Sequence, residues 1–215
     1  MSTMRNYLDR YFREASVIAE GSGLSVDELD RLVAAGAVPA PSYTVLANRI
    51  VSAAFGDLPN DGVPAGRYFA PSQKQWLDRA SGGASLEPAF REEMARALAD
   101  ADRTIHRLPD AFDEDGEPLP GLAARLDSMW GYFLDGVFAL CVAESGSVRS
   151  IARKEVLQEK LSALCEGAEP LDREGLAPLI DQYASAAMPF SPAEYPHSSR
   201  KRLVSDLSQR LSLAD

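Results

Sequence analysis

The chain has 215 residues, enough to bury a sizeable core in one domain or in two small ones. Its 32 acidic and 22 basic side chains give a formal net charge of −10, which weakens any proposal of extended nucleic-acid binding. Apolar residues make up 46% and charged residues 25%, a globular composition that excludes a wholly disordered chain or a collagen-like repeat. Two cysteines are too few for a disulfide scaffold.

No segment of the sequence is typical of export or of a membrane span. Residues 1–19 carry charges throughout and lack the apolar run of a signal peptide. The longest apolar run, residues 129–142, contains Asp135 and is too short to cross a bilayer. We therefore expect a cytoplasmic protein without a membrane partner.

Apolar residues recur at helical spacing along most of the chain, and no long stretch alternates as a half-buried strand does. Ser25 and Glu28 form a capping-box pattern, and Ser191 and Glu194 form a second one. The Gly, Pro and Asp residues of 56–66 predict a loop. Helices are expected around residues 8–20, 25–35, 46–54, 72–81, 90–108, 122–141, 151–164, 176–187 and 199–213.

These patterns predict an all-α protein. The pair Gly82 and Gly83 is the clearest break in the helical pattern, and it suggests a boundary between residues 1–82 and 83–215. The first unit resembles a helix-turn-helix with a long loop, and the second is a helical bundle. A single core that spans both units is the alternative.

Common nucleotide, dinucleotide, zinc and redox motifs are absent from the sequence, so we expect no cofactor and no metal site. Only two histidines, His106 and His197, are available to a catalytic triad. His106 falls near the C-terminal end of its expected helix, where the helix dipole favours a surface cation. Cys141 and Cys165 lack activating neighbours in the sequence and are expected to be structural thiols.

Asp135 interrupts an apolar segment, residues 132–138, where burying a carboxylate is costly without a partner. Lys154 shares a helix face with apolar residues, so its stem is expected to be covered and its amine to meet Asp135. An internal ion pair between neighbouring helices is the simpler interpretation. The alternative is an enzyme in which Asp135 is a buried general acid or base, with Lys154 nearby and His197 at the cavity mouth.

Three consecutive cations fall in the first turn of the last expected helix, where they oppose the positive end of its dipole. Together with a capping serine and the outward-pointing backbone amides of the first turn, these cations are the groups that typically bind an anion or a phosphate. The alternative is that the protein's own acids, in residues 110–117 or at Glu194, satisfy them. The expected ligand contacts are Ser198, Ser199, Arg200 and Arg202, with Tyr43, Arg67, Tyr68 and Trp76 from the loop side.

Residues 15–39 resemble the helix-turn-helix of winged regulators of the mercury-resistance-regulator and excisionase type. Residues 66–69 resemble the wing strand of that family. The resemblance implies a DNA-binding fold, but the second helix offers Asp27, Glu28 and Asp30 where bases and phosphates require cations or amides. We therefore expect this unit to be used for packing or for binding a protein.

A broader resemblance covers most of the chain, with residues 38–43, 67–69, 76–77, 130–136, 141, 154–155 and 198–203. These residues are similar to an uncharacterised bacterial family labelled natural product biosynthesis proteins. The resemblance implies a biosynthetic context and supplies no reaction, cofactor or catalytic residue.

Together these expectations describe an accessory protein that binds an anionic small molecule or a partner protein in a bacterial biosynthetic pathway. Self-sufficient catalysis and nucleic-acid binding are not expected. The enzyme with Asp135 and Lys154 and the helix-turn-helix regulator are the two alternatives.

Overall fold

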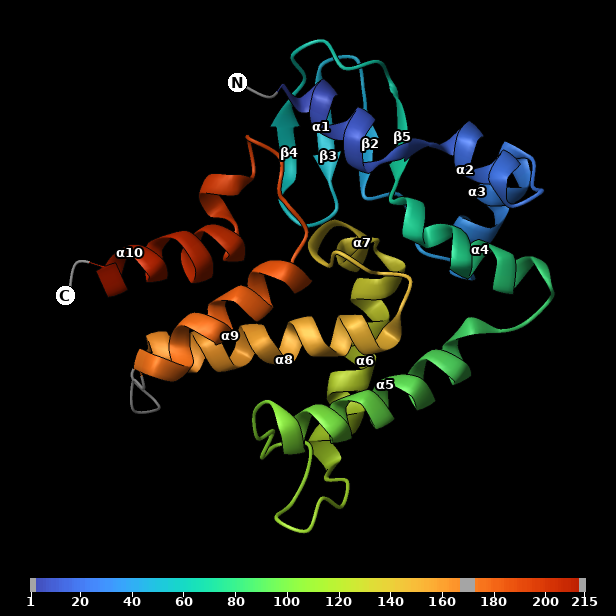
Figure 1. Ribbon diagram of the computed structural model, residues 1–215. Coiled ribbons are helices and arrows are strands. Elements are labelled where there is room, and N and C mark those ends of the chain that lie inside the picture. The colour runs from blue at the N-terminus through green and yellow to red at the C-terminus, as the bar shows by residue number, and fades with distance from the viewer. Residues whose placement is uncertain (1–2, 167–172, 213–215) are drawn as a thin grey trace.

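The computed structural model describes residues 3–166 and 173–212, and helices dominate it (Figure 1). The ten α-helices of this part of the chain are α1 (Met4–Tyr11), α2 (Ala15–Gly21), α3 (Val26–Ala34), α4 (Lys74–Ser81), α5 (Leu86–Thr104), α6 (Pro120–Leu134), α7 (Val137–Cys141), α8 (Val148–Cys165), α9 (Arg173–Ala186) and α10 (Leu207–Ser212). Short turns precede some of them: η1 (Pro71–Gln73), η2 (Tyr195–His197) and the π-helical η3 (Lys201–Asp206). None of the described helices is long and apolar enough to cross a membrane.

The expectation of an all-α fold is wrong in one respect, because five antiparallel strands form a small sheet near the N-terminus. The strands are β1 (Arg13–Glu14), β2 (Tyr43–Val45), β3 (Arg49–Ser52), β4 (Gly56–Pro59) and β5 (Gly66–Phe69), in the order β1-β5-β2-β3-β4. Register is set by Tyr43, which faces Ser52 on one side and Tyr68 on the other.

This sheet replaces the helix expected at residues 46–54 and part of the loop expected at 56–66. Leu46, Ile50 and Ala53 have helical spacing, but they belong to a turn, a strand and a second turn. The β-branched pair Ile50 and Val51 favours the strand, since such side chains lose rotamer freedom in a helix.

The first capping box is confirmed at the start of α3. The Ser25 amide donates to the Glu28 carboxylate at 2.8 Å, and the Glu28 amide donates to the Ser25 hydroxyl at 3.2 Å. Residues 22–25 connect α2 to α3, so two short helices follow one another with a tight turn between them. The likeness of this pair to a DNA-binding helix-turn-helix stays a prediction.

The single helix expected at residues 122–141 is broken at Gly136, which has a φ of +76° and separates α6 from α7. A Cβ at this position would lie 2.5 Å from the carbonyl oxygen of Ala40, so only glycine fits. The Ala40 amide donates to the Leu134 carbonyl at 2.7 Å, and the Ser42 hydroxyl donates to the Gly136 carbonyl at 3.1 Å. The break therefore fastens the end of α6 to the segment that leads into the sheet.

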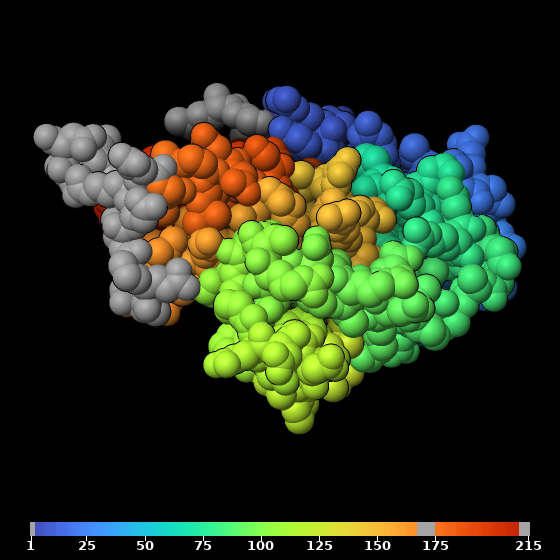
Figure 2. Space-filling model, turned by 60° about the horizontal axis from the view of Figure 1, so that its bottom comes forward, coloured from blue at the N-terminus to red at the C-terminus, as the bar shows by residue number. Residues whose placement is uncertain are grey.

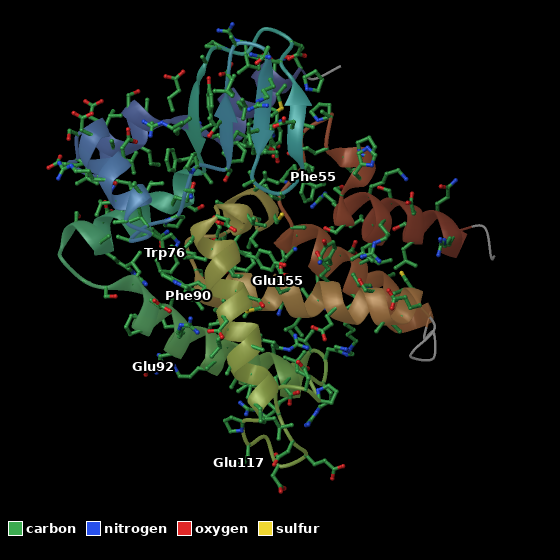
Figure 3. All side chains as sticks on the ribbon, turned by 180° about the vertical axis from the view of Figure 1, so that it is seen from behind. Phe55, Trp76, Phe90, Glu92, Glu117 and Glu155 are labelled. Carbon is green, nitrogen blue, oxygen red and sulfur yellow. The ribbon has the colours of Figure 1, made fainter. Side chains whose placement is uncertain are left out.

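One apolar core continues across the position of Gly82 and Gly83. Trp76 of α4 lies in edge contact with Phe133 of α6 at 4.9 Å between ring centroids, and Phe90 of α5 lies 4.7 Å from Phe133. Figure 3 shows Trp76 and Phe90 directed into the same interior region. The loop between α5 and α6, by contrast, projects from the body, and Glu117 marks its tip (Figures 2 and 3).

Candidate functional site

The expected pair of Asp135 and Lys154 is not formed. Asp135 is exposed, because α6 ends at Leu134 and the left-handed turn at Gly136 directs the chain out of the helical path. The prediction that this carboxylate is buried is therefore wrong, and the acid–base unit of the alternative enzyme does not exist in this structure. His197, the third member of that hypothesis, is exposed in η2.

Lys154 is buried as expected, with only 3% of its residue surface exposed, but its partners lie on its own helix. Its ammonium donates to the Glu155 carboxylate and to the Gln158 amide oxygen, both at 2.8 Å. Burial, the largest single influence, lowers the pKa of Lys154, but Glu155, Tyr183 and Cys141 together outweigh it and leave the pKa above the usual value. The Tyr183 ring lies 6.0 Å from the ammonium, so the charge is enclosed between α8 and α9.

The cations of the last helix contact the protein itself. The Arg200 guanidinium donates to the carbonyls of Ala184 and Ala187 at 2.5 and 2.8 Å, which satisfies the C-terminal end of α9. Lys201 pairs with Asp206 at 2.6 Å, and Arg202 donates to the Ser162 hydroxyl at 3.1 Å. These partners differ from the acids that the sequence suggested.

The serines beside those cations are engaged as well. The Ser198 hydroxyl accepts a bond from the Lys201 amide at 3.1 Å and so caps the last helix. The Ser199 hydroxyl lies 2.8 Å from the Tyr183 hydroxyl. The anion site expected at this helix start stays a prediction.

Glu194 is fully buried and has a different role from the one expected. Its carboxylate accepts hydrogen bonds from the hydroxyls of Tyr43 at 2.5 Å, Ser52 at 2.6 Å and Ser191 at 2.6 Å. The second capping-box sequence thus forms a buried turn, which ties the C-terminal segment to β2 and β3. Three hydroxyl donors to one carboxylate offset part of the cost of burying it.

The four ligand contacts expected from the loop side do not converge on Arg200. Tyr43 and Tyr68 are buried in the sheet layer, and Arg67 forms an ion pair with Asp30 of α3. Trp76 is 1% exposed, and its indole N–H donates to the Ser145 carbonyl at 3.0 Å. The Trp76 ring lies beneath Arg79, a residue that lines a large cavity.

That cavity has a volume of about 540 Å³ and is lined by residues of α4, α5 and the start of α8. Figure 1 shows α4 and α5 in its right half. Its size is within the range of small-molecule sites. We call it the arginine cavity, because it is lined by Gln75, Arg79, Glu93, Arg96, Ala97, Asp100, Gly146, Ser147, Val148 and Arg149.

Three guanidinium groups from three helices border this cavity, and each forms one ion pair at the surface. Arg79 lies 3.8 Å from Glu93 and Arg149 lies 3.2 Å from Asp100, while Arg96 pairs at 3.0 Å with an acid outside the lining. Such exposed pairs contribute about 0–1 kcal/mol, so an anionic ligand competes with them at little cost. A guanidinium has five donors, and most of them are left for a ligand.

Two further features arrange the arginine cavity for an anion. The Arg79 guanidinium lies over the Trp76 ring at 4.8 Å, a cation–π contact that holds it in place. The first turn of α8 contributes Val148 and Arg149 to the lining, and first-turn amides have no acceptor within their helix. A Cβ at Gly146 would lie 2.9 Å from the Gln75 side chain, so glycine permits this close approach of α8 to α4.

The residues that make this cavity were missed by the sequence reasoning. Arg149 lies in the first turn of α8 after the capping residue Ser147, which is the same pattern that drew attention to Arg200. That pattern is a usable signal for Arg149. Arg79 and Arg96 carry no such signal, because each is an ordinary surface arginine until the helices are packed.

The Cys141 thiol does not form a second reactive centre. Burial raises the pKa of Cys141 to about 12, so this thiol is protonated at neutral pH and is a poor nucleophile. Among the described residues, no group of three or more histidine, cysteine or acidic side chains is arranged to hold a metal ion.

Comparisons with known proteins give one match. The model of a family of unknown function, DUF6058, matches residues 86–212, which hold α5 to α10 and every lining residue of the arginine cavity except Gln75 and Arg79. No curated protein and no solved structure matches.

Proposed function

The chain belongs to this family of unknown function, and we propose that it is an accessory binding protein that holds a phosphorylated small ligand in the arginine cavity. The observation that carries the proposal is that Arg79, Arg96 and Arg149 come together at the N-terminus of α8 in a chain of net charge −10. Guanidinium groups and helix N-termini are the two protein features that bind phosphate best.

The charges around the cavity favour a small anion over a polyanion. Its lining holds three cations and two acids, Glu93 and Asp100, and Glu92 beside the lining pairs with Arg96, so the local charges balance. A phosphate monoester competes with these acids for the guanidinium groups, whereas a nucleic acid meets the repulsion of the whole acidic chain. The resemblance to natural product biosynthesis proteins supports a biosynthetic context in the bacterial cytoplasm, and no step of the proposal requires catalysis.

A thermal-shift titration with inorganic phosphate, against sodium chloride of equal ionic strength, tests the proposal. At a hundredfold excess over Kd, binding adds about 2.7 kcal/mol to the free energy of unfolding. For a chain of this size that is roughly 5 to 10 °C in Tm. Arg149→Gln is expected to remove most of the shift.

The matched control is Arg202→Gln, which removes an exposed arginine of the site that the sequence suggested and is expected to keep the phosphate shift. No phosphate-specific stabilisation, or an equal loss in both variants, would contradict the proposal.

A further inference from the structure

A second cavity, which we call the Met188 cavity, has a volume of about 360 Å³, and none of its described lining residues belongs to the arginine cavity. Four segments that are distant in the sequence meet around it: the end of α1, the turn before α4, α7 with the residues that follow it, and the chain after α9. Its volume is at the small end of the range for small-molecule sites. The lining residues are Arg10, Tyr11, Ala70, Pro71, Ser72, Ala139, Val142, Ala143, Met188 and Pro189.

The wall of the Met188 cavity is mostly apolar, and hydrogen bonds hold it in place. Ala139 and Met188 are buried. The Met188 amide donates to the Cys141 carbonyl at 3.0 Å, and the Pro189 carbonyl accepts a hydrogen bond from the Tyr7 hydroxyl at 2.8 Å. Because these backbone groups already have partners, the wall offers apolar surface to a ligand and few hydrogen bonds to water.

Arg10 is the one charged residue among the described members of this lining, and it lies at the edge of the cavity. Its guanidinium lies over the Tyr11 ring at 5.1 Å, and the centroid of that ring lies 5.1 Å from the centroid of the Tyr7 ring. Within residues 3–166 and 173–212, no carboxylate or carbonyl accepts a hydrogen bond from Arg10. The five N–H donors of the guanidinium are therefore left for a ligand.

The position of Arg10 also has a simpler explanation, since a cation in the last turn of α1 interacts favourably with the helix dipole. Arg31 occupies the same place in α3 and does not line the Met188 cavity. The dipole explains both arginines equally. It does not explain why an arginine without an acceptor borders an apolar cavity.

We infer that the Met188 cavity binds a small monocarboxylic acid, whose carboxylate pairs with Arg10 and whose compact apolar body lies within the cavity. A planar guanidinium donates two parallel hydrogen bonds to a carboxylate. One cation matches one negative charge, which favours a carboxylate over the more highly charged phosphate group. The arginine cavity takes no part in this site, so the inference is independent of the proposed function.

Isothermal titration calorimetry with phenylpropionate, its neutral amide phenylpropionamide and the cation phenethylamine tests the inference. The three probes share an aromatic ring on a short chain and differ in charge. The acid is expected to bind about tenfold more tightly than the amide, because a hydrogen bond to a charged group is stronger than one between neutral groups. The amine is expected not to bind.

The variant Arg10→Gln is expected to bind the acid only as weakly as the amide and to leave amide binding unchanged. The matched control is Arg31→Gln, which removes the same charge from the last turn of another short helix and should keep the preference for the acid. Ala139→Leu reduces the space in the cavity and should weaken the binding of both the acid and the amide. If Ala139→Leu does not fold, judged by circular dichroism, the comparison of Arg10→Gln with Arg31→Gln decides, since both arginines are exposed.

Several outcomes would overturn the inference. Phenylpropionate that does not bind at millimolar concentration shows that the cavity is not a site for such acids. Equal binding of acid and amide, or a preference for the acid that survives Arg10→Gln, removes the role of Arg10. Displacement of the acid by inorganic phosphate, or its loss in Arg149→Gln, places the acid in the arginine cavity instead. Failure of phosphate to bind overturns the proposed function and leaves the acid site standing.

Discussion

At the scale of single residues, the unusual feature of this chain is a buried carboxylate without a cation. Glu194 has three hydroxyl partners from β2, β3 and its own turn, so its charge is met by neutral donors. A buried hydroxyl that loses its hydrogen-bond acceptor still carries the free-energy cost of its removal from water, and no hydrogen bond then offsets that cost. Glu194 therefore contributes more to the free energy of unfolding than its place in the sequence suggests.

Replacing Glu194 is expected to weaken the attachment of the C-terminal segment to the sheet. Glu194→Ala leaves Tyr43, Ser52 and Ser191 without their acceptor and should lower the free energy of unfolding by about 3 kcal/mol. Glu194→Gln keeps one acceptor oxygen and should cost less than half as much. Urea unfolding followed by circular dichroism measures both, and a loss below 1 kcal/mol for Glu194→Ala would refute this view of the cluster.

At the scale of helices and strands, two glycines near the end of α6 have opposite roles. Gly131 lies within the helix, and nothing lies within 4 Å of a Cβ built on it. Gly136 has a positive φ and meets the backbone of Ala40. Glycine is thus unfavourable at the first position and required at the second.

The expected consequences have opposite signs. Gly131→Ala should raise the free energy of unfolding by about 0.5–1 kcal/mol, since alanine is the better helix former. Gly136→Ala should lower it by roughly 2 kcal/mol or more, through backbone strain and the clash with Ala40. The two variants serve as each other's controls in one thermal unfolding experiment, and a change of the same sign in both would show that the break after α6 is not set by Gly136.

How far the sequence predicted these elements depends on how local their causes are. The cap of α3 was predictable because Ser25 and Glu28 lie one turn apart. The sheet was not, because Tyr43 needs Tyr68 and Ser52 as neighbours and no short window contains all three. The burial of Lys154 was foreseen from its helix face, but its partner was not, since Asp135 was assigned to a helix that Gly136 breaks.

The same difference between local and distant contacts explains why the candidate site was not predicted from the sequence. A cluster of cations within four residues is visible in a sequence, and it directed attention to Arg200. Arg79, Arg96 and Arg149 lie far apart in the chain and meet only through the packing of α4, α5 and α8. Of the residues named from the sequence, Trp76 alone supports that site, as the ring beneath Arg79.

At the scale of the whole molecule, several acidic protons are held more tightly in the folded chain than in the unfolded one. Burial raises the pKa of Cys141 to about 12 and moves the pKa of Tyr7 well above its ordinary value. The unfolded chain releases these protons first, so alkali favours unfolding. Both groups therefore contribute stability at neutral pH that is lost as the pH rises.

The free energy of unfolding should accordingly fall as the pH rises above about 8.5, the ordinary pKa of a thiol, and fall more steeply above about 10, that of a phenol. Each group contributes at most about 1.4 kcal/mol per pH unit. Cys141→Ala should remove the decline between pH 8.5 and 10, and Tyr7→Phe should reduce the slope above it. Urea unfolding at four pH values measures this, and a profile that rises with pH would contradict it.

The central claim is that the start of α8, with the arginines around it, binds a phosphate group. An amide-resolved NMR titration of the labelled protein with methyl phosphate tests this claim most directly. We predict saturable shifts at the amides of Gly146, Val148 and Arg149, with little change at Arg200 and Arg202. Shifts centred on Arg200 and Arg202, or no saturable shift at any amide, would contradict the account.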